Sequence, residues 1–365
     1  MQKRILILTA GFGEGHNAAA RGIRDGLAAV AGDLAVVETH DLFAETYGFA
    51  NDWSRKAYLA LINRAPRAWE RIYHWVDARD QFAKKLRFFF LLKNRLRELV
   101  DRFRPDVVVS VFPAYAHLLE EIGGRAAPSF QQVVCITDSI TVNAIWFRGA
   151  TALFLVPNEQ TATVLAAAGV PNECVRVTGF PVTPKFAQLG ELRQPPSPGY
   201  GRRVLYVINA GRIEAPEIIR GVAQLTDVRL TVTVGRDERL RRVVEAVRDA
   251  AGRKFEIVGW SDQLPRLMLE SHLLISKAGG ATVQETIAAK CPMIINQVVP
   301  GQEEGNARLI EETHSGVVAL GPDAIIASVQ EAFADNARRW REWSGNISRL
   351  SRPAASLEIA ELLLT

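Results

Sequence analysis

Short apolar runs alternate with helical stretches along this chain, and the alternation occurs twice, on either side of a segment rich in proline and glycine. In the first half, the apolar runs occupy residues 5–9, 34–39, 107–111, 132–136, 152–157 and 175–178. Segments of helical character lie between them, among them 17–31, 114–122 and 159–168. Continuous apolar strands separated by helices are typical of a parallel sheet that is covered on both faces. The first half therefore predicts a Rossmann-like domain.

The second half repeats this organisation after a break. Residues 188–203 lose the periodicity and are rich in proline and glycine, which is a linker composition. The alternation then resumes with apolar runs at 204–208, 230–234, 255–258, 273–276 and 293–296. Helical stretches occupy 215–225, 238–250 and a segment that begins near Ala281. A chain of 365 residues is also too long for one ordinary core.

We therefore predict an α/β protein with two doubly wound Rossmann-like domains facing an interdomain cleft. The N-terminal domain is expected over residues 1–187, the linker over 188–203 and the C-terminal domain over 204–335. A Trp- and Arg-rich helix over 336–350 and a last helix with Pro353 in its first turn are expected to pack back on the N-terminal domain. Ligands of open α/β sheets bind beyond the carboxyl ends of the strands, so each domain would present one ligand to the cleft.

Composition restricts where such a chain works. Hydrophobic residues make up 48% and charged residues 23%, which is typical of a soluble globular protein. The cysteines show neither metal-binding nor disulfide spacing and are expected to be reduced. No apolar run approaches the roughly 20 residues that span a bilayer, and the first run ends at Ala10, too short for a signal peptide. We expect a cytoplasmic protein whose membrane contact, if any, is peripheral.

Positive charge and aromatic residues are concentrated in residues 53–97. This segment holds twelve Lys or Arg and three acids, a local charge of +9 in a chain of net charge +4, and nine of the 29 aromatic residues. Such a composition suits an anionic membrane surface, where each cation contributes roughly 1 kcal/mol. A nucleic-acid patch or a solvated helix packed by its aromatic residues are the alternatives. Residues 88–90 are three consecutive phenylalanines, which cannot all pack on one helix face, and this favours the membrane.

Two loops of the second half have the chemistry of a nucleotide site. Gly279 and Gly280 follow a buried strand and precede a helix, whose free N–H groups and dipole suit a phosphate. Glu285 lies about one turn further on, where its carboxylate can bind a ribose diol. A second loop, Pro300-Gly301-Gln302-Glu303-Glu304-Gly305-Asn306, follows with amide and carboxylate side chains. An ordinary strand-to-helix turn with a solvated Glu is the alternative.

A third glycine loop follows the first strand. Gly11, Gly13 and Gly15 alternate before His16 at a helix start, so a ligand can approach the backbone beside a titratable imidazole. Histidine is suited to accept a proton near neutral pH. The spacing is not that of a dinucleotide-binding loop, but Glu38 can mimic the ribose-binding acid of such a site. A nucleotide-dependent oxidoreductase therefore stays an alternative, as does a glycine turn with a partly exposed histidine.

The strand at 132–136 leads into Thr137 and Asp138, with Trp146 eight residues beyond the acid. A carboxylate at this edge of a parallel sheet would face the same cleft as His16, and would orient the imidazole or bind a hydroxyl. A capping Asp in a polar loop is equally compatible with the sequence. Residues 179–182, Gly-Phe-Pro-Val, read as a rigid turn that closes the domain.

Together these segments resemble the monogalactosyldiacylglycerol synthase and processive diacylglycerol glucosyltransferase family, which is similar to family 28 glycosyltransferases. The resemblance covers nearly the whole chain through the loops at 13–16, 137–138, 179–182, 277–285 and 300–306. It implies a GT-B fold and inverting, metal-independent transfer of galactose or glucose from a UDP-sugar to diacylglycerol or a related lipid. It also implies a peripheral place on the inner face of the cell membrane and no nucleic-acid partner.

The resemblance assigns roles to particular residues. It implies His16 as the base that deprotonates the acceptor. Asp138 is the second catalytic candidate, because of its expected place at the same edge of the sheet. For the donor it implies Thr282, Glu285, Gln302 and Glu303, and we add from the loops themselves Gly13, Gly15, Arg212, Gly279, Gly280 and Asn306. Membrane or acceptor contacts would come from aromatic residues, namely Trp53, Trp69, Trp75, Phe88, Phe89, Phe90 and Trp146.

Two positions depart from the family pattern. Residues 209–214, Asn-Ala-Gly-Arg-Ile-Glu, replace a glycine-rich loop, so the backbone offers fewer phosphate contacts and Arg212 is expected to pair with the diphosphate instead. Ala278 stands where proline is common. A non-catalytic protein that binds nucleotide sugars or lipids is the remaining alternative. The sequence does not indicate the sugar, the acceptor, the linkage, processivity or the oligomeric state.

Overall fold

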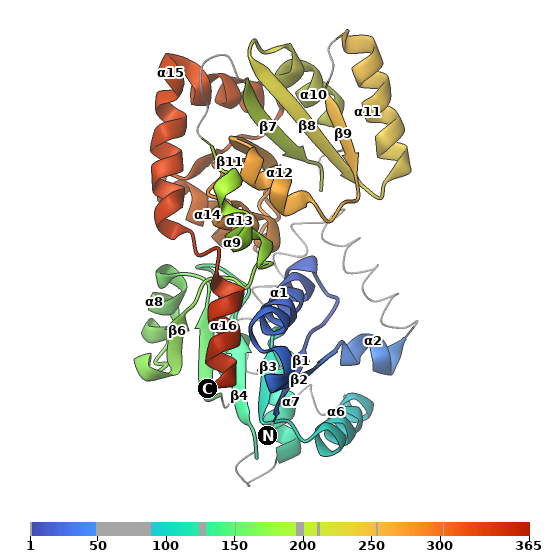
Figure 1. Ribbon diagram of the computed structural model, residues 1–365, viewed down its shortest axis with the longest axis vertical. Helices are drawn as coiled ribbons and strands as arrows, with labels where there is room; N and C mark the ends of the chain where they lie inside the picture. The colour runs from blue at the N-terminus through green and yellow to red at the C-terminus, as the bar shows by residue number, and fades with distance from the viewer. Residues whose placement is uncertain are drawn as a thin grey trace. The chain divides into compact units, whose positions relative to one another are not determined.

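The computed structural model describes residues 2–48, 89–123, 129–149, 151–194, 201–209, 212–252, 255–301 and 303–365. The chain divides into two compact units. The first unit comprises Met1–Pro184, Val299–Gly305 and Ala354–Thr365, and the second comprises Lys185–Val298 and Asn306–Pro353. Each unit is built around one parallel sheet, as the alternation of apolar runs predicts (Figure 1).

The sheet of the first unit has the strand order β2-β1-β3-β4-β5-β6, and its neighbouring strands are parallel. These strands are β1 (Lys3–Leu8), β2 (Ala35–His40), β3 (Val107–Ser110), β4 (Gln131–Cys135), β5 (Leu153–Val156) and β6 (Val175–Val177). The order reverses between β1 and β3, because β2 lies on one side of β1 and the later strands lie on the other. The carboxyl ends of β1 and β3 therefore form the switch point where such sheets bind ligands.

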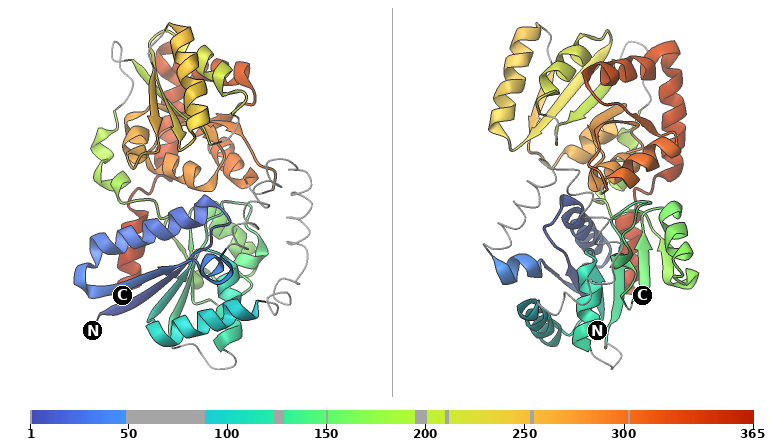
Figure 2. Two further views of the ribbon diagram at one scale, coloured as in Figure 1. Left: turned by 90° about the vertical axis from the view of Figure 1, so that its right-hand side faces the viewer. Right: turned by 180° about the vertical axis from the view of Figure 1, so that it is seen from behind.

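Helices cover both faces of this sheet. They are α1 (Glu14–Val30), α2 (Leu42–Tyr47), α6 (Phe90–Phe103), α7 (Ala114–Gly123), α8 (Glu159–Ala167) and α16 (Ala355–Leu364), with short 3₁₀ turns at Gly32–Leu34, Ala144–Trp146 (η3) and Asn172–Cys174. The left view of Figure 2 shows α1 on one side of the strands and α6 on the other. The helix α16, red in Figure 1, packs beside α1.

The helix α1 is held at two close contacts that require glycine. A Cβ on Gly22 would lie 1.7 Å from the carbonyl oxygen of Pro181, in the turn over residues 179–182. A Cβ on Gly26 would lie 2.2 Å from the carbonyl oxygen of Ser356 in α16. The turn and α16 thus fix the position of α1, and with it the position of His16.

The sheet of the second unit has the order β12-β11-β10-β7-β8-β9, again with parallel neighbours. Its strands are β7 (Arg202–Val207), β8 (Val228–Gly235), β9 (Glu256–Gly259), β10 (Leu273–Lys277), β11 (Met293–Gln297) and β12 (Gly316–Val318). The order reverses between β7 and β10, so the loops after these two strands form the switch point of this sheet.

The helices of the second unit are α9 (Lys185–Gln188), α10 (Ala215–Gln224), α11 (Glu238–Ala251), α12 (Leu264–Glu270), α13 (Gly280–Ala288), α14 (Glu304–Glu312) and α15 (Pro322–Leu350), with a 3₁₀ turn at Gly190–Leu192. Glu304 and Gly305, the first residues of α14, belong to the first unit. The helix α15 is interrupted at Ala334–Ala337, where the backbone leaves the helical region. Its second half carries Trp340 and Trp343 into the core of the second unit, while α16 belongs to the first unit. The last helix begins at Ala355, two residues after the expected proline, because Pro353 lies in the preceding turn.

No helix among the described residues is long and apolar enough to cross a bilayer.

Candidate active site

His16 occupies the switch point of the first sheet. It is the third residue of α1, which begins directly after the glycine loop that follows β1. Its Nδ1 lies 2.8 Å from the carbonyl oxygen of Val111, the residue after β3. A carbonyl oxygen only accepts hydrogen bonds, so Nδ1 carries the proton. The neutral ring then has its lone pair on Nε2, for which the described residues provide no partner.

The surroundings keep this imidazole neutral. Burial lowers the pKa of His16 to about 4, partly offset by the hydrogen bond to Val111. The Thr137 hydroxyl lies 3.1 Å from the same Nδ1. The Phe112 ring meets the imidazole edge-on, with 5.1 Å between centroids, and the Trp146 ring lies 5.9 Å away, tilted by 46°. His16 is therefore a fixed, uncharged proton acceptor with an apolar wall on two sides.

Of the two roles predicted for Asp138, direct orientation of the His16 imidazole is wrong, and the binding of a hydroxyl stays a prediction. The Asp138 side chain accepts a hydrogen bond from Trp146 Nε1 at 2.8 Å, and the Nδ1 contacts of His16 come from Val111 and Thr137. A membrane contact of Trp146 is wrong, because its side chain is 2% exposed and belongs to a buried apolar cluster, and its acceptor contact stays a prediction. A buried indole N–H needs an acceptor, and Asp138 supplies it. The acid therefore contacts Trp146, and Trp146 lies against His16.

The glycine loop before His16 is held by its neighbours. Asp41 Oδ2 accepts a hydrogen bond from Gly11 N at 2.8 Å, and the Tyr115 hydroxyl donates to Thr9 O at 2.7 Å. Gly13 is the N-cap of α1. A Cβ on Gly15 would meet nothing within 4 Å, so this glycine faces open space, as a close approach of a ligand requires. Contact of Gly13 and Gly15 with the donor stays a prediction.

The glycine turn of the second unit joins β10 to α13, at the switch point of its sheet. Gly279 is the N-cap of α13 and Gly280 its first residue. Thr282 lies in the first turn, where its hydroxyl is 3.4 Å from Asn209 Nδ2, at the end of β7. Glu285 follows on the same helix and is partly buried. The local structure is thus the strand, glycine turn and helix start that the sequence predicts for a phosphate and ribose site.

The loop over residues 300–306 has a structural role as well as its predicted one. Asn306 is buried and its Nδ2 donates to Ala278 O at 3.1 Å, which braces the glycine turn. Glu303 is also buried, and its carboxylate accepts a hydrogen bond from Val299 N at 3.0 Å. Gln302 lies outside the described residues. The sugar contacts predicted for Gln302 and Glu303 stay predictions.

Residues Val299–Gly305 belong to the first unit and approach the loop that follows Asp138. A Cβ on Gly305 would lie 2.0 Å from Ser139 O and 2.8 Å from Thr141 N, so only glycine fits there. The structure therefore brings two loops together that are more than 150 residues apart in sequence, and both contain predicted site residues.

Arg212 lies in the loop after β7 and forms an ion pair with Asp237 at 2.6 Å. Asp237 is the N-cap of α11, and hydrogen bonds from backbone N–H groups, chiefly that of Leu240, together with Arg212 hold its pKa below the ordinary value. The Arg212 side chain is mostly exposed. Its predicted pairing with a diphosphate stays a prediction.

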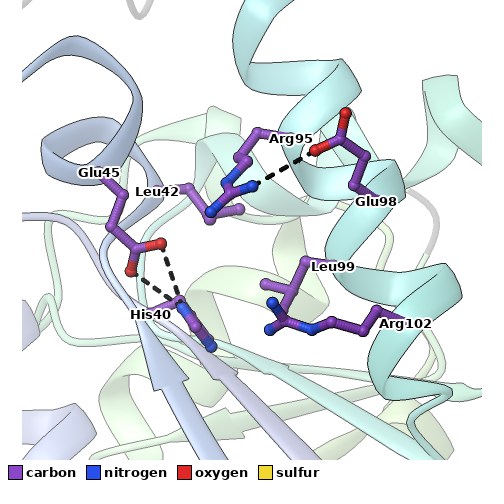
Figure 3. A pocket seen from close by; sticks show the side chains of 7 residues that line it. All are labelled: His40, Leu42, Glu45, Arg95, Glu98, Leu99 and Arg102. Atoms are coloured by element: carbon purple, nitrogen blue, oxygen red, sulfur yellow. Dashed lines mark hydrogen bonds and ion pairs between the residues drawn. The ribbon is translucent and has the colours of Figure 1, made fainter.

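A pocket of about 160 Å³ lies between the end of β2, α2 and α6 (Figure 3). Its charged walls are paired with one another or with Glu38: Arg95 with Glu98, His40 with Glu45 and Glu38, and Arg102 with Glu38. The His40 hydrogen bond lowers the pKa of Glu38 most strongly. Glu38 is the acid that a dinucleotide site would use to bind its ribose, but its carboxylate is already paired with His40 and Arg102. This pairing weighs against the oxidoreductase alternative.

The predicted membrane segment is described only in part. Trp53, Trp69, Trp75 and Phe88 lie outside the described residues. Phe89 packs on Phe43 and Tyr47, whereas Phe90 and Leu91 at the start of α6 are 63% and 58% exposed. As expected for three consecutive phenylalanines, the described pair does not pack on one face, since Phe89 lies against other rings and Phe90 is exposed.

Sequence reasoning missed Phe112 and the carbonyl of Val111. The sequence feature that could have indicated them is their place directly after β3, the strand that pairs with β1. Among the described residues, no group of three His, Cys, Asp or Glu side chains is arranged to hold a metal ion.

The sequence comparisons with known proteins all lead to glycosyltransferases. A family model described as monogalactosyldiacylglycerol synthase matches residues 16–182, and the glycosyltransferase family 28 C-terminal domain matches residues 217–339. A probable monogalactosyldiacylglycerol synthase 2 of Oryza sativa is 27% identical, over 98% of this chain and 80% of its own. The processive diacylglycerol beta-glucosyltransferase of Bacillus subtilis is 25% identical, over 91% of this chain and 87% of its own.

Solved structures share the fold at low identity. Acinetobacter baumannii MurG has a TM-score of 0.58 at 13% identity, over 99% of both chains. The spinosyn rhamnosyltransferase SpnG has a TM-score of 0.59 at 17% identity, over 99% of this chain and 100% of its own. A UDP-N-acetylglucosamine 2-epimerase reaches 0.60 at 14% identity, over 100% of this chain and 96% of its own, so the GT-B fold alone does not decide between transfer and epimerisation. Both family models that match this chain describe glycosyltransferases, and over nearly its whole length the chain is similar to monogalactosyldiacylglycerol synthases and processive diacylglycerol glucosyltransferases.

Proposed function

We propose that this chain is an inverting glycosyltransferase that moves galactose or glucose from a UDP-sugar to diacylglycerol or a related membrane lipid. The observation that carries the proposal is the geometry of His16, a neutral imidazole whose Nδ1 is committed to Val111 and whose Nε2 is free to accept a proton. Similarity to this family supports the reaction class, and the names of the relatives include both sugars.

In this reaction the acceptor hydroxyl gives its proton to Nε2 of His16. The hydroxyl oxygen forms a bond to the anomeric carbon of the sugar as the bond from that carbon to the diphosphate breaks, and UDP leaves with the electron pair. The helix start at Gly279 and Gly280 would stabilise the departing diphosphate, and Glu285 would bind the ribose. The Phe112 and Trp146 rings give the base an apolar surrounding, which suits an acceptor with a lipid body.

We also propose that the enzyme works without a metal ion, at the anionic inner face of the cell membrane. The charge of +9 in residues 53–97 and the exposed Phe90 and Leu91 support membrane contact. A chelator such as EDTA should leave the rate unchanged, and loss of activity restored by Mg²⁺ would contradict metal-independent transfer.

The test is incubation with membrane lipids and a panel of UDP-sugars, followed by mass analysis of the lipid products. The wild-type chain should add one or more hexoses to diacylglycerol. His16→Ala should abolish transfer while UDP still binds, and Glu285→Ala should weaken UDP binding. Near-full turnover of His16→Ala would show that the base is another residue. A UDP-sugar that is epimerised or bound without transfer would contradict the proposed reaction.

A further inference from the structure

Asp138 is a partly buried carboxylate whose side chain has one hydrogen-bond partner in the described part of the chain, the Trp146 indole. Burial raises its pKa to about 6, and the bond from Trp146 opposes this shift. A carboxylate in such surroundings costs free energy when no cation is paired with it. Costly unpaired acids of this kind are concentrated at functional sites.

Anchoring the indole does not by itself explain an acid at this position. The amide oxygen of an asparagine would accept the same N–H hydrogen bond without the cost of burying a charge. The negative charge of Asp138 therefore needs a reason beyond the packing of Trp146.

The neighbouring His16 gives that reason. Thr137 contacts the Nδ1 edge of the imidazole, and Trp146, fixed by Asp138, lies against the ring at 5.9 Å. Two successive residues thus act on the same imidazole, one directly and one through the indole. His16 must become positively charged when it takes the acceptor's proton, in a site whose burial disfavours that charge.

We propose that Asp138 is a positioning residue of the transfer reaction, which holds the Trp146 ring against His16 and favours the protonated imidazole by its negative charge. This inference rests on the proposed function of His16 as the base. The proton still moves from the acceptor hydroxyl to Nε2, and Asp138 exchanges no atom.

Other titratable groups on the surrounding elements have partners of their own. Glu14 on α1 pairs with Arg21, and His117 on α7 bonds Ile145 O. Arg148 after η3, Glu159 on α8 and Glu303 in the adjacent loop also have interactions of their own. Within the described residues, no ion pair links any of these groups to Asp138. The pH response of this site is therefore expected to come from Asp138 and His16.

The experiment compares Asp138→Asn and Trp146→Phe with the wild-type enzyme. Trp340→Phe is the matched control, because its indole N–H donates to His272 O in the second unit and is equally buried. We expect kcat to fall roughly 10- to 100-fold in each site variant, with KM for the UDP-sugar unchanged. The double variant should be little worse than either single one, since both act on one imidazole. Trp340→Phe should keep its kcat.

The pH profile and the thermal stability separate positioning from a structural role. Wild-type activity should fall as the pH drops through about 6, where Asp138 takes up a proton, and Asp138→Asn should lack this step. The raised pKa means that ionised Asp138 costs stability above that pH. Asp138→Asn should therefore have a higher Tm than the wild type at pH 8 and no gain at pH 4. An equal kcat, an unchanged pH profile, or a loss of stability that parallels the loss of activity would overturn the proposal.

An NMR measurement does not depend on activity. The Hε1 resonance of His16, assigned with His16→Ala, should shift in Trp146→Phe and should show a small step near pH 6 that Asp138→Asn abolishes. If neither change is seen, the positioning role is wrong even in an active enzyme. If both are seen but the wild-type chain transfers no sugar, the proposed function is wrong and the contact of Asp138, Trp146 and His16 stands.

Discussion

The imidazole of His16 is fixed from parts of the first unit that lie far from it in sequence. Val111 and Thr137 both contact Nδ1, and the two contacts have different effects on the imidazole. The carbonyl of Val111 determines which nitrogen carries the proton, while the Thr137 hydroxyl adds a second, longer contact to the same atom. A side chain that determines only part of the ring's position should have a partial effect on the rate.

Thr137→Val removes the hydroxyl and keeps the shape of the side chain. We expect kcat to fall by roughly 3- to 10-fold, the equivalent of one neutral hydrogen bond, and UDP affinity to stay unchanged. Steady-state kinetics with a separate UDP-binding measurement checks this. Thr178→Val, at the end of β6, serves as a control for the loss of a buried hydroxyl. A fall of 1000-fold would mean that Thr137, and not Val111, determines the protonated nitrogen.

The candidate residues that the sequence could predict are those with unusual chemistry in an unusual local pattern. His16 after alternating glycines and Glu285 after a glycine turn are of this kind. The roles of Phe112 and Trp146 could not be predicted, because an aromatic residue after a strand is most often core, and only the strand order brings these two to His16. The membrane contact considered for Trp146 is wrong for the same reason: sequence does not distinguish a buried indole that has a carboxylate partner from a surface one.

At the scale of elements, α1 is seated by Gly22 and Gly26 against the turn at 179–182 and against α16. Gly22→Ala places a methyl group where the backbone of Pro181 cannot yield easily. We expect a loss of about 1–3 kcal/mol in the free energy of unfolding of the first unit, with a fall in kcat because α1 carries His16. Gly15→Ala on the same helix meets open space, so it should leave stability unchanged. Denaturant unfolding of both variants tests this, and equal stability of Gly22→Ala and wild type would contradict the close contact.

The start of α6 is the described part of the predicted membrane segment. Phe90 and Leu91 are exposed there, beside Arg95 and Arg97 on the next turn. Phe90→Ser with Leu91→Ser should weaken binding to vesicles that contain anionic phospholipid, because apolar area no longer enters the headgroup region. Leu34→Ser is the matched control, since Leu34 is equally exposed at 66% but lies on another element of this unit.

Binding is measured by co-sedimentation with vesicles while the salt concentration and the fraction of anionic lipid are varied. Wild-type binding should decrease as salt is raised and should be weak on neutral vesicles, since cations of this segment are screened. Binding that is insensitive to salt, or that falls equally in the Leu34 variant, would contradict a membrane face at α6.

Periodicity predicted most strands and long helices within a few residues, because buried parallel strands are continuous apolar runs. It missed the short elements α2, α12, α14 and β12, the first half of α15, and α6, which begins within the segment interpreted only as basic and aromatic. It also placed the helix over 336–350 with the C-terminal helix on the first domain. The structure gives the two helices to different units, since Trp340 and Trp343 are buried in the second core while α16 packs on α1. Apolar residues predict that a helix is buried, but not which core buries it.

At the scale of the whole molecule, the two units repeat one plan. Each sheet reverses its strand order once, and each reversal carries a glycine loop at a helix start: the loop before α1 in the first unit and the turn before α13 in the second. This is why the sequence patterns predict a base loop and a phosphate loop separately. Each unit also contains a histidine whose pKa is lowered to about 4 by desolvation, His16 in the first and His272 in the second, and we expect these to make the molecule sensitive to acid.

His272 provides the test of that sensitivity. Burial lowers its pKa to about 4, and the nearby Arg203 and Arg193 lower it further, while its Nδ1 accepts a hydrogen bond from Arg203 N at 2.8 Å. The folded second unit therefore binds this proton less tightly than the unfolded chain. The stability that neutral His272 contributes is complete above pH 6.5 and is lost as the pH falls towards 4. Between pH 7 and pH 5 the loss amounts to about 2 kcal/mol.

His272→Asn keeps an acceptor near the position of Nδ1 and removes the titration, so the second unit of this variant should lose less stability between pH 7 and pH 5 than the wild type. Hydrogen exchange of the strands β7 and β10 at the two pH values, in urea, reports the free energy of opening of this unit alone. His314→Asn is the matched control in the same unit, because His314 is exposed and asparagine tolerates its left-handed backbone. This control should keep the wild-type pH dependence. If His272→Asn keeps it as well, the acid sensitivity of the second unit has another source than this buried imidazole.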